Sequence, residues 1–185
     1  MANLIANPSF EVDTNADGLA DNWSIVKSVS GTPTTSRVAG LFGSYAQRVQ
    51  YTSSSDAGKI VYLLSDLSAV GTVSSGQQVM GVAWVRLVST GTVNVQSATY
   101  AADAAGTTIS TGNTTHTSFP QNVWVPVMST HLMPVNASRA RFYIAIGLID
   151  TGDSITLDVD GVYLSPDANF DHYGKYPVIG KGVRL

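Results

Sequence analysis

The sequence predicts an all-β chain, an antiparallel β-sandwich of the jelly-roll type with an extended C-terminal tail. Apolar and polar residues alternate with period two along the chain, with β-branched and aromatic residues frequent, and no 3.6-residue periodicity persists over three turns. Turn-forming clusters such as Ser53–Asp56 and Asp150–Asp153 separate the alternating runs. Several strands at this spacing, without intervening helices, are typical of a sandwich or jelly roll.

Seven segments have the alternation expected of strands. In chain order they are Gln47–Thr52, Lys59–Leu64, Gln78–Val88, Val93–Tyr100, Val123–Thr130, Ala140–Leu148 and Ser154–Leu164. The sixth segment also predicts two faces. Its apolar side is formed by Phe142, Ile144, Ile146 and Leu148. The opposite side is small and polar enough to face solvent or a ligand, and consists of Arg141, Tyr143, Ala145 and Gly147.

Two regions depart from this pattern. Residues Ala101–Gln121 are interpreted as a hairpin or a long loop at the rim of the sandwich. The alternation ends after Leu164, which divides the chain into a sandwich over residues 1–164 and a docking arm over 165–185. The arm has three bases and no acid after His172. We expect it to be held by its own domain, by a symmetry mate or by a different partner, and the predicted docking residues are Phe170, Tyr173, Tyr176 and Arg184.

Length and composition exclude several classes of protein. A chain of 185 residues has the size of one domain. Its net charge of −3 argues against a nucleic-acid partner bound through phosphates. The longest apolar run, Phe142–Ile149, is far shorter than the about 20 residues of a membrane-spanning helix, so we expect no membrane partner. No export signal follows Met1, and the absence of cysteine excludes disulfides and thiolate chemistry.

The strongest local motif is the acidic segment Asp13–Asp21. Oxygen side chains stand at alternating positions, on Asp13, Asn15, Asp17 and finally Asp21, and Gly18 permits a tight turn. Loops of this composition wrap calcium. An EF-hand would place a glutamate where this chain has Ser24, so that motif is not met. Two interpretations stay open, a short structural calcium loop and a solvated turn rich in Asp and Asn.

An ordered set of segments resembles the calcium-stabilised jelly-roll carbohydrate-binding modules of families four, nine and twenty-two. The resemblance spans about residues 3–164. The matching segments are Asn3–Ile5, Asn7–Glu11, the acidic loop, Asn22-Trp23, Gly43–Val49, Gly81–Arg86, Val123-Trp124 and Leu157–Leu164.

The resemblance implies a structural calcium ion. In the family, the glutamate after the first phenylalanine and an aspartate in the last strand ligate calcium, helped by backbone carbonyls. Carried over, the ligands are Glu11 and Asp160, with carbonyls from the loop near Gly40–Gly43. Burying two such acids together without a cation would be costly. The family usually has two acids where this chain has Asp160-Gly161.

The resemblance also implies a glycan ligand. The three tryptophans, Trp23, Trp84 and Trp124, fall at positions that pack the core in the family, so we do not expect them to be sugar platforms. Better candidates combine aromatic rings with amide or guanidinium groups at strand positions facing away from the core. These are Tyr62, Gln96, Tyr100, Arg141 and Tyr143, and their alternative interpretation is ordinary sheet surface.

Catalysis finds little support. The chain has no nucleophile elbow, no zinc-protease motif, no phosphate-binding loop and no second glutamate to pair with Glu11. The three histidines, His116, His131 and His172, are interpreted as surface residues. We therefore expect a non-enzyme.

Two functions remain. The first is a bacteriophage virion protein, a capsid decoration or tail accessory made in the host cytoplasm, which docks through its arm to other virion proteins and binds host glycans weakly. The alternative is the glycan-binding module of a secreted bacterial polysaccharide-degrading enzyme.

Overall fold

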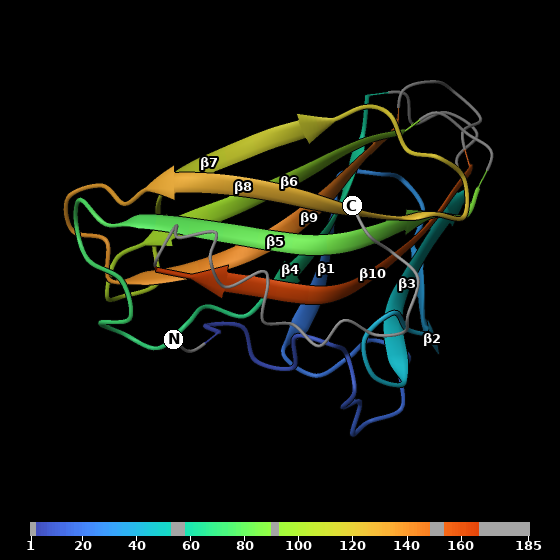
Figure 1. Cartoon of the computed structure of the whole chain (residues 1–185), viewed down its shortest axis with the longest axis horizontal. Helices are drawn as coiled ribbons and strands as arrows, with labels where there is room; N and C mark the ends of the chain where they lie inside the picture. The colour runs from blue at the N-terminus through green and yellow to red at the C-terminus, as the bar shows by residue number, and fades with distance from the viewer. Residues whose placement is uncertain (1–2, 53–57, 90–92, 149–153, 167–185) are drawn as a thin grey trace, which may run out of the picture.

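The computed structural model describes residues 3–52, 58–89, 93–148 and 154–166, and it is an all-β sandwich (Figure 1). The strands of the described residues are β1 (Trp23–Lys27), β2 (Thr34–Ala39), β3 (Tyr45–Thr52), β4 (Ile60–Ser65), β5 (Gln78–Leu87), β6 (Val93–Ala102), β7 (Thr108–His116), β8 (Trp124–Leu132), β9 (Arg139–Leu148) and β10 (Ser154–Ser165). Among these same residues, no helix has the length and apolar character needed to cross a membrane.

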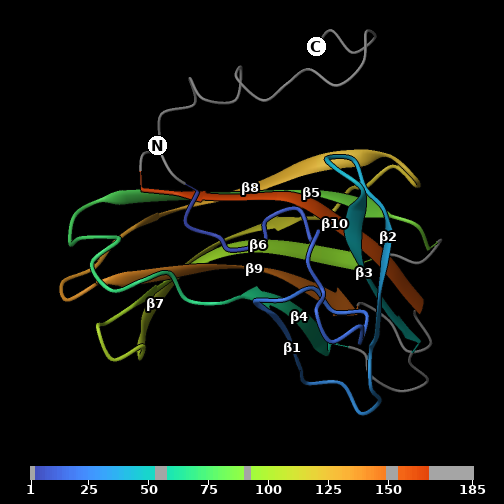
Figure 2. The same cartoon turned by 90° about the horizontal axis from the view of Figure 1, so that it is seen from below.

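The strands form two five-stranded antiparallel sheets that face each other (Figure 2). Sheet A has the order β1-β4-β9-β6-β7, and sheet B has the order β2-β3-β10-β5-β8.

All seven predicted strands are present, and the segment Ala101–Gln121 contains β7, which forms the expected hairpin with β6. The sequence reasoning missed β1 and β2. Both lie at sheet edges, where much of each strand is exposed and the apolar alternation is weak.

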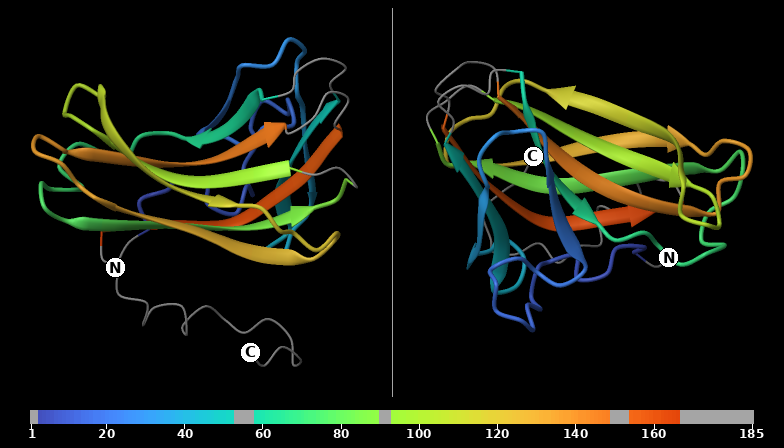
Figure 3. Two further views of the ribbon diagram at one scale, coloured as in Figure 1. Left: turned by 90° about the horizontal axis from the view of Figure 1, so that it is seen from above. Right: turned by 180° about the vertical axis from the view of Figure 1, so that it is seen from behind.

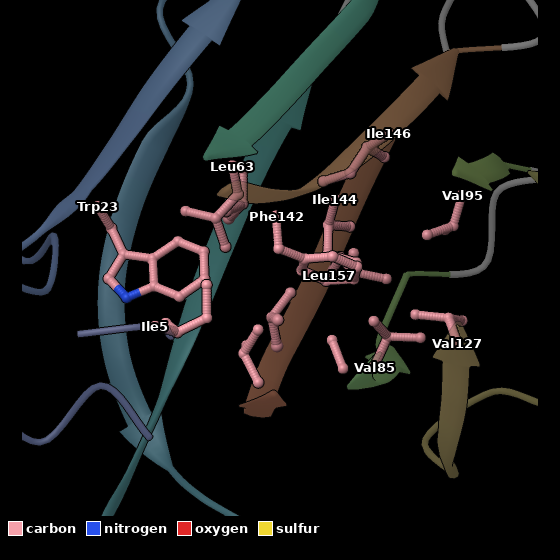
Figure 4. Packing of buried hydrophobic residues seen from close by; sticks show 14 of the residues in the cluster. Ile5, Trp23, Leu63, Val85, Val95, Val127, Phe142, Ile144, Ile146 and Leu157 are labelled. Atoms are coloured by element: carbon pink, nitrogen blue, oxygen red, sulfur yellow. The ribbon is translucent and has the colours of Figure 1, made fainter. Parts of the chain in front are cut away.

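The core lies between the sheets and is formed by the inward residues of β1, β3, β4, β5, β6, β8, β9 and β10 (Figure 4). Phe142, Ile144 and Ile146 of β9 are fully buried there, as the alternation predicts. The sheets approach closely at Gly81 of β5, because a Cβ atom at this position would overlap the ring of Phe142. The missing side chain therefore makes room for the aromatic ring that β9 points into the core.

The N-terminal segment closes one open side of the sandwich and adds to the core. It runs beside β10, with the Leu4 amide donating to the Leu164 carbonyl at 2.9 Å. Phe10 is fully buried and packs on Trp23, with 4.7 Å between ring centroids. Phe10 has a φ of 56°, which is unusual for a bulky residue. This backbone turn lets Phe10 enter the core while its neighbour Glu11 is half-buried outside it.

At the opposite side, β7 of sheet A lies against β8 of sheet B (Figure 3). A Cβ atom at Gly112 would lie 2.7 Å from that of His131, so the two strands are in close contact. His131 and His116 are half-buried in this region, and they hydrogen-bond to Ser110 and Ser97 at 2.7 and 3.1 Å. Each of these histidines is thus only partly at the surface, and each is held by a serine hydroxyl.

The expectation that all three tryptophans pack the core is right for Trp23 and wrong for the other two. Trp84 and Trp124 are half-buried and lie on the outer side of sheet B. The reason is strand parity. In β5 the inward positions are Ala83 and Val85, so the residue between them must point away from the core.

Candidate functional site

All five predicted glycan residues lie on the outer side of sheet A, on three adjacent strands. We call this surface the tyrosine face and define it by Tyr62 of β4, Gln96 and Tyr100 of β6, and Arg141 and Tyr143 of β9. The strand register places Tyr62, Ala145 and Gln96 side by side, and places Arg141 beside Tyr100. Residues that are up to 81 positions apart in sequence are thus brought together by strand pairing.

The three tyrosine rings pack as one cluster centred on Tyr143. Its ring centroid lies 4.8 Å from that of Tyr100 and 5.6 Å from that of Tyr62. Tyr143 is only 5% exposed, whereas the flanking rings are half-buried. The expectation of an exposed platform ring therefore does not hold for Tyr143, because its neighbours cover it. Burial, followed by the influence of Tyr100 and Tyr62, raises the pKa of Tyr143 to about 12, which keeps its hydroxyl neutral.

Arg141 extends the cluster at one end. Its guanidinium carbon lies 4.9 Å from the centroid of the Tyr100 ring, a cation–π distance. The Nε atom is shielded from solvent and has no hydrogen-bond partner. Within the described residues, Arg141 also has no acid within ion-pair distance.

The other end of the tyrosine face is a shallow hollow between β4, β6 and β9. Ile60, Ala145 and Gly147 form its apolar part, and Asn94, Gln96 and Lys59 contribute polar groups. The side-chain amide of Asn94 makes no hydrogen bond with the described residues, and Gln96 makes one long bond of 3.3 Å to Thr115. Small apolar side chains beside unsatisfied amides are suited to a ligand that is rich in hydroxyls. Sequence reasoning missed Asn94, although it shares the parity of Gln96 and Tyr100.

The outer side of sheet B has a different chemistry. We call it the arginine face and define it by Arg48 of β3, Asp158 of β10, Arg86 of β5 and Trp124 of β8, which lie in one row of the register. Asp158 is fully buried, and both arginines bind it at 2.7 Å. Arg86 also lies 4.7 Å from the Trp124 ring centroid. The sequence analysis did not identify this ion-pair cluster, because its members show no motif spacing.

Glu11 and Asp160 lie on either side of the loop that joins β2 and β3. Glu11 Oε1 accepts hydrogen bonds from the amides of Ser44 and Tyr45, at 2.7 and 3.0 Å. Asp160 Oδ2 accepts from Leu41 and Phe42, both at 2.7 Å, and its Oδ1 accepts from Gly161. A Cβ atom at Gly43, which has a φ of 79°, would overlap the Glu11 carboxylate. Glycine at this position therefore leaves the space that the Glu11 carboxylate occupies against the loop.

The electrostatics of this acid pair fit a cation. Burial raises the pKa of Asp160 to about 6 and the nearby charge of Glu11 adds to this, although three backbone amides oppose it. A Cβ atom at Gly40 would lie 2.5 Å from the Tyr45 carbonyl oxygen and 2.9 Å from Asp160 Oδ2, so a carbonyl lies near the acids. Glu11 Oε2 has no hydrogen-bond partner within the described residues. Carboxylate and carbonyl oxygens of this kind are the ligands that calcium prefers.

In the acidic segment Asp13–Asp21 most polar side chains bind one another, although Asp13 Oδ1 is shielded from solvent and has no hydrogen-bond partner. Asp21 accepts hydrogen bonds from the amide and the hydroxyl of Thr14, and Asp17 accepts from Asn15 and from the Leu19 amide. Asp13 pairs with Arg37 at 3.4 Å. No cluster of three or more His, Cys, Asp or Glu side chains suited to a metal occurs in the described part of the chain. This arrangement favours the Asx-rich turn over a calcium loop.

The predicted docking residues Phe170, Tyr173, Tyr176 and Arg184 lie outside the described residues. The strand before them, β10, ends at Ser165, one residue beyond the predicted boundary of the sandwich.

Comparison with known proteins gives a fold. No family model matches the sequence, and no curated protein matches it. Among solved structures, the module TmCBM61 in complex with β-1,4-galactotriose has a TM-score of 0.57 and 15% identity, with 89% of this chain and 98% of that chain covered. The CBM22-1 xylan-binding domain of Paenibacillus barcinonensis Xyn10C has a TM-score of 0.54 and 15% identity, covering 85% and 90%. The chain has the jelly-roll fold of carbohydrate-binding modules.

A phage protein is also similar to this carbohydrate-binding-module-like chain. The enzymatically active domain of tailspike protein 4 from bacteriophage CBA120 has a TM-score of 0.62 and 14% identity over 88% of this chain. The present chain spans only 21% of that tailspike structure. At these levels of identity the likeness establishes the fold, and function must come from the site itself.

Proposed function

We propose that this chain is a non-catalytic glycan-binding protein and that the tyrosine face is its binding surface. The observation that carries the proposal is the cluster of three tyrosines flanked by Arg141 and by the amides of Asn94 and Gln96. Sugar rings present apolar C–H faces and polar hydroxyl edges, so they need aromatic surface and hydrogen-bond groups together. The half-buried rings of Tyr62 and Tyr100 supply the first, and Asn94 and Gln96 supply the second.

Similar structures support this choice of ligand class. One is a complex with β-1,4-galactotriose, and another is described as a xylan-binding domain. The arginine face offers less, because its polar groups bind one another.

Glycan-array screening tests the proposal, followed by calorimetric titration of the best oligosaccharide. We expect Tyr100→Ala to weaken binding about 30-fold or more, as the loss of an aromatic contact at the centre of a site does. Trp124→Ala is the matched control, because it removes a half-buried ring from the opposite sheet. The proposal fails if no glycan binds, or if Trp124→Ala weakens binding as much as Tyr100→Ala.

The acid pair Glu11 and Asp160 supports a second proposal, a structural calcium ion. The two carboxylates would hold the ion with help from backbone carbonyls such as that of Tyr45, at the start of β3. The positive charge would compensate two acids that now oppose each other. It would also tie the N-terminal segment, the start of β3 and the last strand together, because each contributes a ligand.

For the biological setting we propose a virion role, as a capsid decoration or tail accessory. The phage tailspike domain among the similar structures favours it. Many copies on one particle would convert weak glycan binding into avidity. The proposed route of attachment is the segment 165–185.

The alternative is a module of a secreted polysaccharide-degrading enzyme, favoured by the xylanase module among the similar structures. Deletion of residues 167–185 separates the two settings. On the virion proposal, the deleted protein stays folded but no longer incorporates into particles. Unchanged incorporation of the deleted protein would refute the docking arm.

A further inference from the structure

We propose that the glycan bound by the tyrosine face is anionic, and that a carboxylate or sulfate group of the polysaccharide binds Arg141. This inference rests on the proposed function and specifies its ligand. Carboxylate and sulfate share the chemistry that matters here, two or more acceptor oxygens with a negative charge.

Arg141 differs from every other arginine in the described residues. Arg37 pairs with Asp13, and Arg48 and Arg86 pair with Asp158. Arg139 donates from its Nε to the Ser68 carbonyl at 2.8 Å. Arg141 contacts the Tyr100 ring, and its shielded Nε has no acceptor.

The unsatisfied guanidinium is suited to an anion rather than to a hydroxyl. The half-buried guanidinium has no acid within ion-pair distance among the described residues, so the site gains when a ligand supplies the negative charge. The planar fork of arginine matches the paired oxygens of carboxylate or sulfate, and its packing on Tyr100 restricts its orientation. A sugar ring that contacts Tyr100 would bring its own substituents next to this group.

The charges around the tyrosine face favour an anion as well. Lys59, at the hollow, has no hydrogen-bond or ion-pair partner among the described residues, and Arg139 shares the strand parity of Arg141. Two acids follow the strands that flank the start of β9, where Arg139 and Arg141 lie. They are Asp66 after β4 and Asp103 after β6. Asp103 accepts a hydrogen bond from the Thr107 amide, and neither acid forms an ion pair with Arg139 or Arg141.

The dimensions of the surface indicate a polymer rather than a single acidic sugar. Outward positions run along β9 from Gly147, at the hollow, to Arg141. The six residue steps between these two positions span about 20 Å, which accommodates several sugar units. Cations lie near both ends of this path, with Tyr143 between them. A chain with repeated negative charges can therefore contact Lys59 and Arg141 together.

Binding measurements with four defined probes test this inference. Xylohexaose and β-1,4-galactotriose are neutral, oligogalacturonate carries carboxylates, and a heparin oligosaccharide carries sulfates. We expect at least one anionic probe to bind more tightly than both neutral probes and to weaken as salt rises. The preference between the two anionic probes tells which group the site accepts.

Variants test whether the anionic probe binds at Arg141. Arg141→Ala should weaken the anionic probe tenfold or more, and Arg141→Lys should retain part of the affinity, because it keeps the charge and loses the fork. Lys27→Ala is the matched control. It also removes one positive charge, but Lys27 lies on edge strand β1 at a position that does not point to the tyrosine face. Thermal melts confirm that each variant is folded, and Arg141→Gln replaces Arg141→Ala if that variant is unfolded.

The outcomes separate the inference from the proposed function. Tight binding of a neutral probe that Arg141→Ala does not change overturns the anionic ligand and leaves the proposed function intact. An equal loss in Arg141→Ala and Lys27→Ala also overturns it, because the binding then reflects overall charge. Binding of none of the probes or of any array glycan overturns both.

Discussion

The two outer faces of the sandwich are built from the same strand geometry but use their polar groups in opposite ways. On the arginine face, Asp158 is buried between Arg48 and Arg86, so the charges are neutralised within the protein. On the tyrosine face, Arg141 and Asn94 have no such partners in the described residues. A sheet surface whose polar groups are already paired contributes to stability, whereas one with unpaired groups beside aromatic rings is available for a ligand.

The largest expected effect lies on the arginine face. Replacing the central acid, as in Asp158→Asn, leaves two close arginines without their counter-charge. Loss of one member of a buried ion pair typically costs about 3–5 kcal/mol. We expect the free energy of unfolding, measured in urea, to fall by this amount while glycan affinity of the folded protein stays unchanged. A variant with wild-type stability would show that the arginine face is not a structural cluster.

On the tyrosine face, the central ring should matter for packing and the flanking rings for binding. Tyr143→Ala removes a buried ring and should cost about 3 kcal/mol of stability. Tyr143→Phe keeps the ring and should melt like the wild type. Tyr100→Ala should cost less stability than Tyr143→Ala while weakening glycan binding. If Tyr143→Ala melts like the wild type, Tyr143 does not stabilise the fold and the proposed division between a packing ring and binding rings is wrong.

Calcium provides a smaller effect that should be independent of both faces. If Glu11 and Asp160 hold the ion, free calcium at about 100 times its dissociation constant stabilises the fold by about 2.7 kcal/mol. For a chain of this size, that corresponds to about 5–10 °C in melting temperature. Chelation should lower the melting temperature by that amount in the wild type and have little effect in Glu11→Gln. A melting curve indifferent to chelator and to added calcium would contradict the site.

The smallest effect is expected where the two sheets meet, at β7 and β8. Burial lowers the pKa of His116 and of His131, so the folded protein binds protons less readily than the unfolded chain. Their contribution to stability is therefore complete above the unfolded pKa of about 6.5 and is lost as the pH falls below it. Asp160 has the opposite sign, because its raised pKa makes the folded state gain stability as the pH falls through about 6.

Comparison with a double variant isolates the histidines from Asp160. In His116→Gln/His131→Gln the loss of stability between pH 6.5 and 5 should be smaller than in the wild type. Identical pH profiles for the two proteins would remove the histidines from the explanation.

Much of the fold could be predicted from the sequence, because buried strands impose alternation on their residues. The parity of β9 correctly assigned Phe142 to the core and Arg141 to the outside. The two missed strands, β1 and β2, bury too little to be recognised. Parity also decides the tryptophans, and reliance on resemblance instead of parity placed Trp84 wrongly in the core.

The residues that form the site could be predicted from the sequence, but their burial and contacts could not. Strand parity and residue type together located the tyrosine face, whose members come from β4, β6 and β9. That Tyr143 is covered by its neighbours, or that Arg141 has no partner, depends on side-chain packing across strands distant in sequence. The cluster around Asp158 could not be predicted either, because its members come together only through the pairing of β3, β10 and β5.

The contrast between the two faces is tested most directly by amide NMR spectra recorded during titration with oligogalacturonate and with xylohexaose. The largest shift changes should fall on β4, β6 and β9, around Tyr62, Tyr100 and Arg141, while β3, β5 and β10 change little. Shift changes concentrated around Arg48, Arg86 and Trp124 would show that the ligand binds the arginine face, and would contradict the account.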